Sequence, residues 1–377
     1  MKIGILCYPT SGGSGVVATE LGSALATRGH EVHVISYRLP FRIRPASDRL
    51  HFHKVEIPVY PLFEYPSYGL AAAAFMAKVV EERALDLLHV HYAYPHAVSA
   101  YLARRMTGRR DLPIVTTLHG TDIALVRQDE SFASLTRFGI LESDAVTAVS
   151  AFLRSTTRGW FGIRKPIEVI PNFVDTDRFQ PRKRGPEDRC TIVHVSNFRP
   201  VKRSLDAVRA LGLLRRKVDA RLRMIGTGPE LEAARALAGK LRVAGAVEFL
   251  GEEKHIEREL ARADLLISTS EFEGFGLAPL EAMACGVPVV ATRAGGITEV
   301  VEEGSTGMVV DVGDVEGMAE RMSEILLDRA LARRLGAAAR ERAVRVFSAP
   351  RVVPKYERLY GRLLRAAGRA GEVSAHA

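Results

Sequence analysis

The chain has 377 residues, of which 47% are hydrophobic and 26% are charged, and its formal net charge is +9 at pH 7. This length and balance are typical of a globular protein with two or three domains, and they exclude a largely disordered chain. The cysteines Cys7, Cys190 and Cys285 lie far apart without metal-like spacing, which favours a reduced, cytoplasmic compartment. No apolar stretch approaches the length of a membrane span, and the basic excess comes without a nucleic-acid-binding motif. We therefore expect a cytoplasmic protein with no nucleic-acid partner and no stable membrane insertion.

Short apolar runs alternate with longer amphipathic stretches along nearly the whole chain, a rhythm typical of parallel sheets built from βαβ units. In the first half we expect strands at 2–8, 31–36, 52–57, 87–91, 114–118, 145–148 and 168–170, with helices at 16–28, 68–83, 97–106 and 151–160. In the second half we expect strands at 191–196, 221–225, 247–250, 265–268, 287–291 and 308–311, with helices between them.

The polar, proline-bearing stretch 179–186 has no periodicity and is typical of a linker. It separates an N-terminal Rossmann-like domain, 1–175, from a C-terminal Rossmann-like domain, 176–345. Open α/β sheets bind ligands at the carboxyl ends of their strands, so two such domains facing each other would place both binding edges along one cleft. The fold class is therefore α/β, with two doubly wound sheets.

The first predicted strand leads into the small residues of 9–15, and a helix follows. Such a turn lets the backbone approach an anion closely. The spacing Gly13-x-Gly15-x-x-Ala18 also fits the dinucleotide fingerprint of a dehydrogenase, which needs an acid at the end of the second strand. That strand ends at Ser36 without an acid, so we disfavour an NAD-dependent oxidoreductase. A tight turn without a ligand is the plain alternative.

Two cations, Arg199 and Lys202, follow the first strand of the second half and precede a predicted helix. They are suited to bind a diphosphate and to stabilise it as a leaving group. The plain alternative is a pair of solvated charges. Cations at a helix start are slightly unfavourable for the helix dipole, which favours a functional role.

The segment 273–281 places the carboxylates of Glu273 and Glu281 on either side of a glycine-bearing turn that opens a helix. We expect that helix to occupy 280–284, with Pro279 where proline is tolerated at a helix start. Free N–H groups and the positive end of the helix dipole bind phosphate, and carboxylates accept hydrogen bonds from sugar hydroxyls. The segment therefore predicts a nucleotide-sugar site, against the alternative of a well-capped helix with an ordinary loop acid.

The paired glutamates, the Arg199 and Lys202 loop and the two-domain rhythm together resemble the retaining glycosyltransferases of family 4, which have the GT-B fold. The resemblance covers essentially the whole chain. The segments 7–22, 117–122 and 196–203 are similar to those family members that join N-acetylglucosamine to L-malate in bacillithiol biosynthesis. The resemblance implies that the C-terminal segment, 346–377, is helical, packs back on the first domain and ends in a flexible tail.

The resemblance also implies roles for the donor-binding residues. Glu281 would bind the ribose hydroxyls of UDP, and Glu273 would hold hydroxyls of the donor sugar. Phe275, Gly276 and Leu277 would lie at the diphosphate, partly through backbone N–H groups.

Further roles implied by the resemblance concern the cations and the first domain. Lys202 matches the diphosphate lysine of the family, and Arg199 is expected to replace an arginine that many relatives carry where this chain has Asn197. Gly13 would face the donor phosphate, and His119 would lie near the transferred sugar; a buried strand-end histidine is its plain alternative. The predicted catalytic residues are His119, Arg199, Lys202 and Glu273.

An L-malate acceptor carries two carboxylates, so its pocket needs cations and hydroxyl donors. Our candidates for this pocket are Ser14, Tyr94, Thr117 and Arg137. Tyr94 could equally pack in the core, and Arg137 could be a solvated helix residue.

The implied activity is a hexosyl transfer from UDP-N-acetylglucosamine to the hydroxyl of L-malate with the anomeric configuration retained. A carboxylate nucleophile is one route to retention, and Asp122 is the nearest acid for it. The family mechanism is instead a same-face substitution in which the leaving phosphate oxygen takes the acceptor proton. It needs no metal and no cofactor, and we predict no metal ligands.

Two further alternatives stay open. One is a family 4 enzyme with a lipid-linked or sugar acceptor, in which Arg38, Arg42, Arg44 and Arg49 could meet an anionic membrane; exposed apolar residues on a first-domain helix would favour it. The other is a nucleotide-sugar sensor without catalysis. The sequence does not fix the acceptor or the oligomeric state, for which a homodimer is one expectation.

Overall fold

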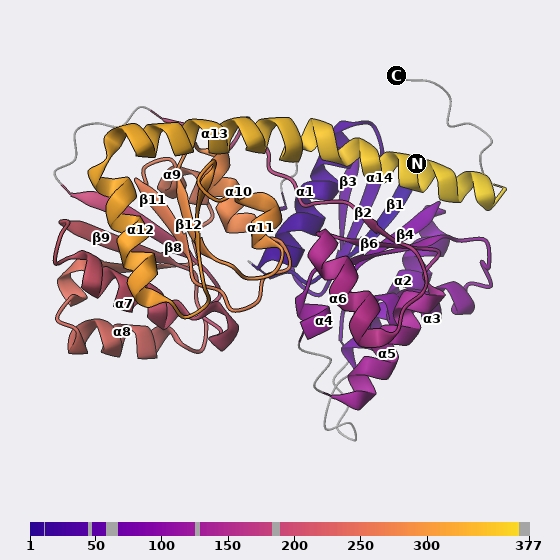
Figure 1. The fold of residues 1–377 in the computed structure, drawn as a ribbon. Helices are drawn as coiled ribbons and strands as arrows, with labels where there is room; N and C mark the ends of the chain where they lie inside the picture. The colour runs from indigo at the N-terminus through magenta and orange to yellow at the C-terminus, as the bar shows by residue number, and fades with distance from the viewer. Residues whose placement is uncertain (11, 44–46, 58–66, 125–128, 183–188, 369–377) are drawn as a thin grey trace. The chain divides into compact units, whose positions relative to one another are not determined.

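The computed structural model describes residues 1–10, 12–43, 47–57, 67–124, 129–182 and 189–368. Contacts divide the chain into two compact units, one of residues 1–171 with 352–377 and one of residues 172–351 (Figure 1). The expected linker, 179–186, thus falls inside the second unit. Arg44, residues 183–186 of that linker and the expected tail at 369–377 lie outside the described residues.

The first unit is built on a parallel sheet of seven strands in the order β3-β2-β1-β4-β5-β6-β7. Its strands are β1 (Lys2–Leu6), β2 (Glu31–Ser36), β3 (Leu50–Lys54), β4 (Leu87–His91), β5 (Ile114–Leu118), β6 (Ala145–Ala148) and β7 (Ile167–Val169). Its helices are α1 (Gly13–Thr27), α2 (Tyr68–Arg83), the π-helix η1 (Ala93–Ala97), α3 (Val98–Met106), α4 (Thr121–Ala124), α5 (Glu130–Glu142) and α6 (Ala151–Phe161).

The second unit repeats this plan with a parallel sheet of six strands in the order β10-β9-β8-β11-β12-β13. Its strands are β8 (Cys190–Val195), β9 (Ala220–Ile225), β10 (Val247–Gly251), β11 (Leu265–Ser268), β12 (Val289–Thr292) and β13 (Gly307–Val310). Its helices are the 3-10 helices η3 (Pro200–Lys202) and η4 (Ala244–Ala246), and α7 (Ser204–Leu214), α8 (Leu231–Lys240), α9 (Ile256–Leu260), α10 (Leu277–Ala284), α11 (Ile297–Val300), α12 (Val315–Leu327) and α13 (Arg329–Phe347).

Burial explains why these runs form sheets. Every residue of β4 and β5 is buried, as expected for parallel strands that helices cover on both faces. The edge strand β3 is only partly buried, because it has a neighbour on one side alone. In the second unit α7 packs on α12 and α10 packs on α13, on the helical layers visible in Figure 1. The predicted α/β class and each predicted strand are confirmed, with strand ends shifted by a few residues.

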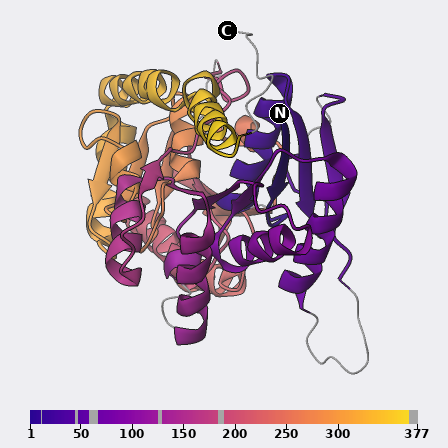
Figure 2. The ribbon, with the colours of Figure 1, turned by 90° about the vertical axis from the view of Figure 1, so that its right-hand side faces the viewer.

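The last helix, α14 (Ala349–Ala366), belongs to the first unit from Val352 onward. Its Glu357 accepts two hydrogen bonds of 2.8 Å from Arg28, and its Tyr360 hydroxyl lies 2.7 Å from Nδ1 of His89 in β4. Figures 1 and 2 both show this yellow helix beside the N-terminus. Within the described part of the chain, we find no helix that combines the length and the apolar character needed to cross a bilayer.

Candidate functional site

Each sheet reverses its strand order at one place, between β1 and β4 in the first unit and between β8 and β11 in the second. Ligands of open α/β sheets bind at the carboxyl ends of the strands beside such a reversal. In the second unit these ends carry η3 and the segment 269–276, and in the first unit they carry the start of α1, Tyr92 and the turn into η1. The predicted donor residues of the second unit thus lie at its reversal, whereas Gly13 and most predicted acceptor residues lie near the reversal of the first unit.

The second unit joins Lys202 and Glu273 directly. Nζ of Lys202 donates to Oε2 of Glu273 at 2.5 Å, and the two side chains remain 22% and 21% exposed. Backbone contacts hold the loops together: Thr269 Oγ1 donates to the Lys202 carbonyl at 2.9 Å, and the Glu271 N–H donates to the Val201 carbonyl at 2.8 Å. A cation and a carboxylate 71 positions apart therefore form one charged pair that solvent still reaches.

The helix after Glu273 begins earlier than the sequence predicted. It starts at Leu277 instead of Leu280, and Pro279 lies inside its first turn, where a missing N–H is tolerated. Gly276 has φ +101°, a left-handed backbone that favours glycine, and a Cβ there would lie 3.1 Å from Cγ1 of Ile297. The N–H groups of Gly276, Leu277 and Ala278 have no acceptor among the described residues. They are therefore available to an anion.

The other predicted donor residues have different surroundings. The Phe275 ring is buried edge-on against Phe347, with ring centres 5.6 Å apart, so this residue offers a ligand its backbone only. The Glu281 side chain is 3% exposed on α10. Arg199 is exposed, and its guanidinium has no polar partner in the described parts of the chain.

In the first unit, α1 begins at Gly13, which is exposed, and Ser14 is buried behind it. The Ser14 hydroxyl donates to the Tyr92 hydroxyl at 2.8 Å. A Cβ on Gly15 would lie 2.5 Å from the Tyr8 carbonyl oxygen, so the helix start and the end of β1 can approach this closely only at a glycine. In the predicted anion loop 9–15, Ser11 lies outside the described residues, and residues 13–15 form a helix start packed tightly on the residues that follow β1.

His119 lies just after β5, paired with a second histidine that the sequence analysis did not select. Nε2 of His119 is 2.8 Å from Nδ1 of His91, and the rings are stacked with centres 5.0 Å apart. Burial, with a smaller contribution from His96, lowers the pKa of His119 to about 3. Burial and the neighbouring histidines lower the pKa of His91 as well. Both imidazoles are therefore neutral at pH 7.

The position of the shared hydrogen follows from what surrounds the pair. Nε2 of His91 is buried and has no hydrogen-bond partner among the described residues. A buried lone pair is tolerated better than a buried N–H without an acceptor. We therefore assign the His91 hydrogen to Nδ1, which donates to His119 Nε2. His119 then keeps its own hydrogen on Nδ1, where it can donate to an oxygen of a ligand.

The predicted acceptor residues are only partly brought together. Ser14 contacts Tyr92, whereas the Tyr94 ring packs on Phe132 of α5, with centres 5.0 Å apart. The Thr117 hydroxyl is buried 2.7 Å from both His89 Nε2 and Thr147 Oγ1. Arg137 is exposed on α5 without a polar partner among the described residues.

Tyr92 is a residue that the sequence analysis missed. Its ring lies edge-on to His119, with centres 5.6 Å apart, and its hydroxyl accepts from Ser14. Its φ of +91° is an outlier for an aromatic residue, and such strain is concentrated at functional sites. The available signal was its position directly after the buried strand 87–91, at the carboxyl end of a strand, where open α/β sheets bind ligands.

Asp122 is not placed as a nucleophile. Its Oδ1 accepts from the N–H groups of His119 at 3.1 Å and Gly120 at 2.9 Å, and its Oδ2 accepts from the Ala93 N–H at 3.1 Å. Burial raises the pKa of Asp122 to about 6, although these backbone hydrogen bonds lower it. With both oxygens occupied, the carboxylate ties the loops after β4 and β5 together.

Comparisons with known proteins agree with this geometry. The family described as "Glycosyltransferase Family 4" matches residues 11–178, and the one described as "Glycosyl transferases group 1" matches residues 175–342. The chain is 46% identical over 373 residues to N-acetyl-alpha-D-glucosaminyl L-malate synthase of Bacillus anthracis, a match that covers 97% of this chain and 98% of that protein.

More distant relatives extend the comparison. The chain is 35% identical over 291 residues to a GDP-mannose-dependent alpha-(1-6)-phosphatidylinositol monomannoside mannosyltransferase of Mycolicibacterium smegmatis, covering 72% of this chain and 75% of that protein. The fold of the present chain is similar to that of sucrose-phosphate synthase from Thermosynechococcus elongatus. The TM-score is 0.83 at 22% identity, and the match covers 97% of this chain and 99% of that chain. The chain therefore belongs to glycosyltransferase family 4 and has the GT-B fold.

Proposed function

We propose that this protein transfers N-acetylglucosamine from UDP-N-acetylglucosamine to the hydroxyl of L-malate with retention of configuration, the first step of bacillithiol biosynthesis. The observation that carries the chemistry is the Lys202–Glu273 pair, whose Glu273 lies a few residues before the N–H groups at the start of α10 that have no acceptor among the described residues. The choice of donor sugar and acceptor is supported by the 46% identity to the Bacillus anthracis malate synthase over nearly the whole chain.

The donor would bind at the reversal point of the second sheet. Its diphosphate would accept hydrogen bonds from the N–H groups of Gly276 and Leu277, helped by the positive end of the α10 dipole. Glu273 would accept from sugar hydroxyls, and Glu281 from ribose hydroxyls. Because Lys202 already contacts Glu273, the ammonium is held where a sugar-bound phosphate would lie next to it.

Catalysis would then depend on stabilising the departing diphosphate. As the bond to the anomeric carbon breaks, negative charge grows on the β-phosphate oxygen, and Lys202, Arg199 and the α10 N–H groups would meet that charge. The same oxygen would take the proton of the malate hydroxyl, which attacks from the same face. The saturated hydrogen bonding of Asp122 supports this route over a covalent intermediate.

The acceptor would bind at the reversal point of the first sheet. Nδ1–H of His119 would donate to an oxygen of the transferred sugar, and Gly13 would offer its N–H to the donor phosphate. The Ser14–Tyr92 contact supports Tyr92, in place of Tyr94, as the tyrosine that meets malate. Thr117 would position His89 through its buried hydrogen bond, and the guanidinium of Arg137, which has no polar partner in the part of the chain that the structure describes, would suit a carboxylate.

The decisive experiment is a release assay. Purified protein is incubated with UDP-N-acetylglucosamine and a panel of small hydroxy acids, and UDP release and the anomeric configuration of the product are followed by NMR. We expect release with L-malate and an α-linked product. Donor binding without release under any acceptor would favour the sensor alternative, and an inverted product would contradict the mechanism.

One observation favours a second candidate, a lipid-linked acceptor. Helix α5 exposes four large apolar side chains at every third position, each 37–39% exposed: Phe132, Leu135, Phe138 and Leu141. An apolar face of this kind, beside Arg137, suits a membrane surface. Sedimentation with anionic vesicles tests it: binding that Leu135→Ser and Phe138→Ser abolish would support a lipid acceptor, and its absence would favour malate.

A further inference from the structure

The strand pair at the edge of the first sheet carries four residues with metal-ligating side chains on one face. Glu31 and His33 lie on β2, and His51 and His53 lie on β3. The parallel register pairs His33 with His51 and Ile35 with His53. Because side chains alternate along a strand, Glu31 and His33 share a face, and the register brings His51 and His53 to it. The reading of the sequence selected none of these residues.

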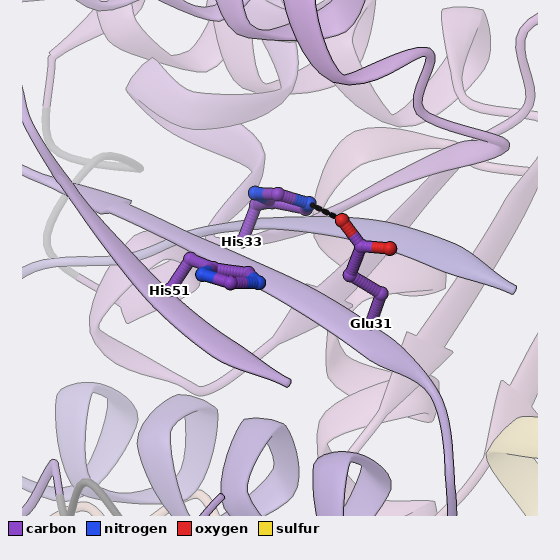
Figure 3. Close-up of side chains that lie close together, drawn as sticks. All are labelled: Glu31, His33 and His51. Atoms are coloured by element: carbon purple, nitrogen blue, oxygen red, sulfur yellow. Dashed lines mark hydrogen bonds and ion pairs between the residues drawn. The ribbon is translucent and has the colours of Figure 1, made fainter. Parts of the chain in front are cut away.

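Three of the four converge closely enough to share an ion. One ligand atom from each of Glu31, His33 and His51 lies within 4.8 Å of the other two, as Figure 3 shows. Nε2 of His33 lies 3.1 Å from Oε1 of Glu31, and the His33 and His51 rings are stacked with centres 4.9 Å apart. We propose that Glu31, His33 and His51 bind one divalent transition-metal ion of the zinc class.

The chemistry of the residues selects the ion. Two imidazoles and one carboxylate are ligands that zinc accepts, with a fourth position left for water. Ligand atoms about 2.1 Å from zinc lie about 3.4 Å apart in a tetrahedron, so the Glu31–His33 pair already has the required spacing. His51 is half-buried on the edge strand, and a turn of its ring would bring it in. Mg²⁺ is disfavoured, because it prefers a ligand set made up of oxygen atoms.

The surroundings of His33 already resemble those of a ligated histidine. Its Nδ1 lies 2.8 Å from Nε2 of His53, so Nδ1–H can donate there while Nε2 faces Glu31. Ligating histidines usually donate their other N–H in this way. In the metal-bound protein, the ion would take the place of the hydrogen between Nε2 of His33 and Glu31.

The positive charge closest to Glu31 is on an exposed side chain, that of Lys2. Nζ of Lys2 lies 3.9 Å from Oε2 of Glu31, but its side chain is 44% exposed and can turn to water when an ion binds. Two residues of opposite charge at the end of α2, Arg83 and Glu82, lie near His53, so their electrostatic effects on it oppose each other. Glu31 opens β2, at the end of the sheet opposite to the strand ends used for ligands. The ion would therefore not take part in the proposed transfer; it would tie the edge strand to β2.

The test uses the untagged full chain, stripped with a chelator and titrated with Zn²⁺ in competition with a chromophoric chelator, and separately with Co²⁺ followed by visible absorption. We expect one Zn²⁺ per chain and the strong d–d bands of Co²⁺ in a tetrahedral site. In His51→Phe an aromatic ring can still stack on His33, but the metal ligand is lost. When His51→Phe is combined with Glu31→Ala, Zn²⁺ binding should be abolished. His53→Gln should weaken binding about tenfold or more.

His255→Gln is the matched control, because His255 is a surface histidine beside Glu257 in the second unit and should leave binding intact. A second readout uses Trp160, the single tryptophan, which lies in the first unit. Zn²⁺ should raise the unfolding midpoint of its fluorescence in the wild type but not in His51→Phe. Binding that His51→Phe leaves unchanged, binding lost equally in His255→Gln, or no stoichiometric binding would each overturn the proposal.

Discussion

The two units prepare their reversal points by opposite means. The second unit presents a charged pair, Lys202 and Glu273, which solvent still reaches, together with N–H groups at a helix start that no described residue accepts from. The first unit presents neutral imidazoles, with His89, His91 and His96 wholly buried and His119 half-buried beside them. The difference matches the proposed chemistry. A leaving diphosphate needs positive charge, whereas the transferred sugar needs oriented hydrogen-bond donors that do not change their charge near pH 7.

The largest expected effect removes the charge in the second unit. Lys202→Ala should lower turnover about 100- to 1000-fold, because one preorganised donor to the developing phosphate charge is lost. Steady-state kinetics of UDP release measures this, with calorimetric UDP binding as a check on folding. Arg199→Ala is the matched control: Arg199 is exposed and unpaired among the described residues, so we expect a smaller loss. Unchanged turnover in Lys202→Ala would refute the leaving-group role.

Acid should destabilise the first unit, with its buried histidines, before it destabilises the second. Burial lowers the pKa of His89 and His119 to about 3 and that of His96 to about 4, against about 6.5 in an unfolded chain. Between pH 6.5 and pH 4 the unfolded state therefore binds protons that the folded state does not, so the free energy of unfolding falls as pH falls. Asp122, whose pKa is raised to about 6, acts in the opposite direction.

The second unit has a single strongly shifted histidine among its described residues, His194, whose pKa burial lowers to about 4. Urea unfolding at pH 7 and pH 5 tests the difference, with Trp160 fluorescence reporting the first unit and circular dichroism reporting both. We expect the fluorescence midpoint to fall more than the circular dichroism midpoint. Equal shifts in the two signals would mean that the buried imidazoles do not set the acid sensitivity.

The same contrast explains what the sequence could predict. The donor site lies in loops that follow strands, so residue type and position sufficed to predict a diphosphate site at Arg199 and Lys202 and a hydroxyl-binding carboxylate at Glu273. The contact between Lys202 and Glu273, 71 positions apart, is seen only in the structure. The acceptor site depends on a backbone conformation that cannot be predicted from the residue types. With a φ of +91°, Tyr92 contacts Ser14, whereas Tyr94, the tyrosine selected from the sequence, packs on Phe132. The stacking of His91 on His119 needed the sheet register.

Two glycines at the start of α1, Gly13 and Gly15, should differ in their effect on stability. Gly15→Ala should lower the free energy of unfolding by about 1–3 kcal/mol, because its Cβ would meet the backbone oxygens of Tyr8 and Thr10 at 2.5 and 2.7 Å. A Cβ on Gly13 meets nothing within 4 Å, so Gly13→Ala should leave stability within about 0.5 kcal/mol. Chemical denaturation measures both. If Gly13→Ala proves as destabilising as Gly15→Ala, the helix start is not packed as described.

The smallest expected effect concerns the hydrogen on His119. His91→Leu keeps an apolar filling but removes the donor to His119 Nε2, so His119 can place its hydrogen on either nitrogen and no longer presents Nδ1–H to the sugar in every molecule. The loss of one such hydrogen bond costs about 1 kcal/mol, which corresponds to a fall in turnover of about fivefold. His91→Asn restores an N–H near the position of Nδ1 and should recover part of the turnover at the same stability as His91→Leu. A purely structural His91 would give two variants whose turnover follows their unfolding free energy, whereas a positioning His91 separates turnover from stability.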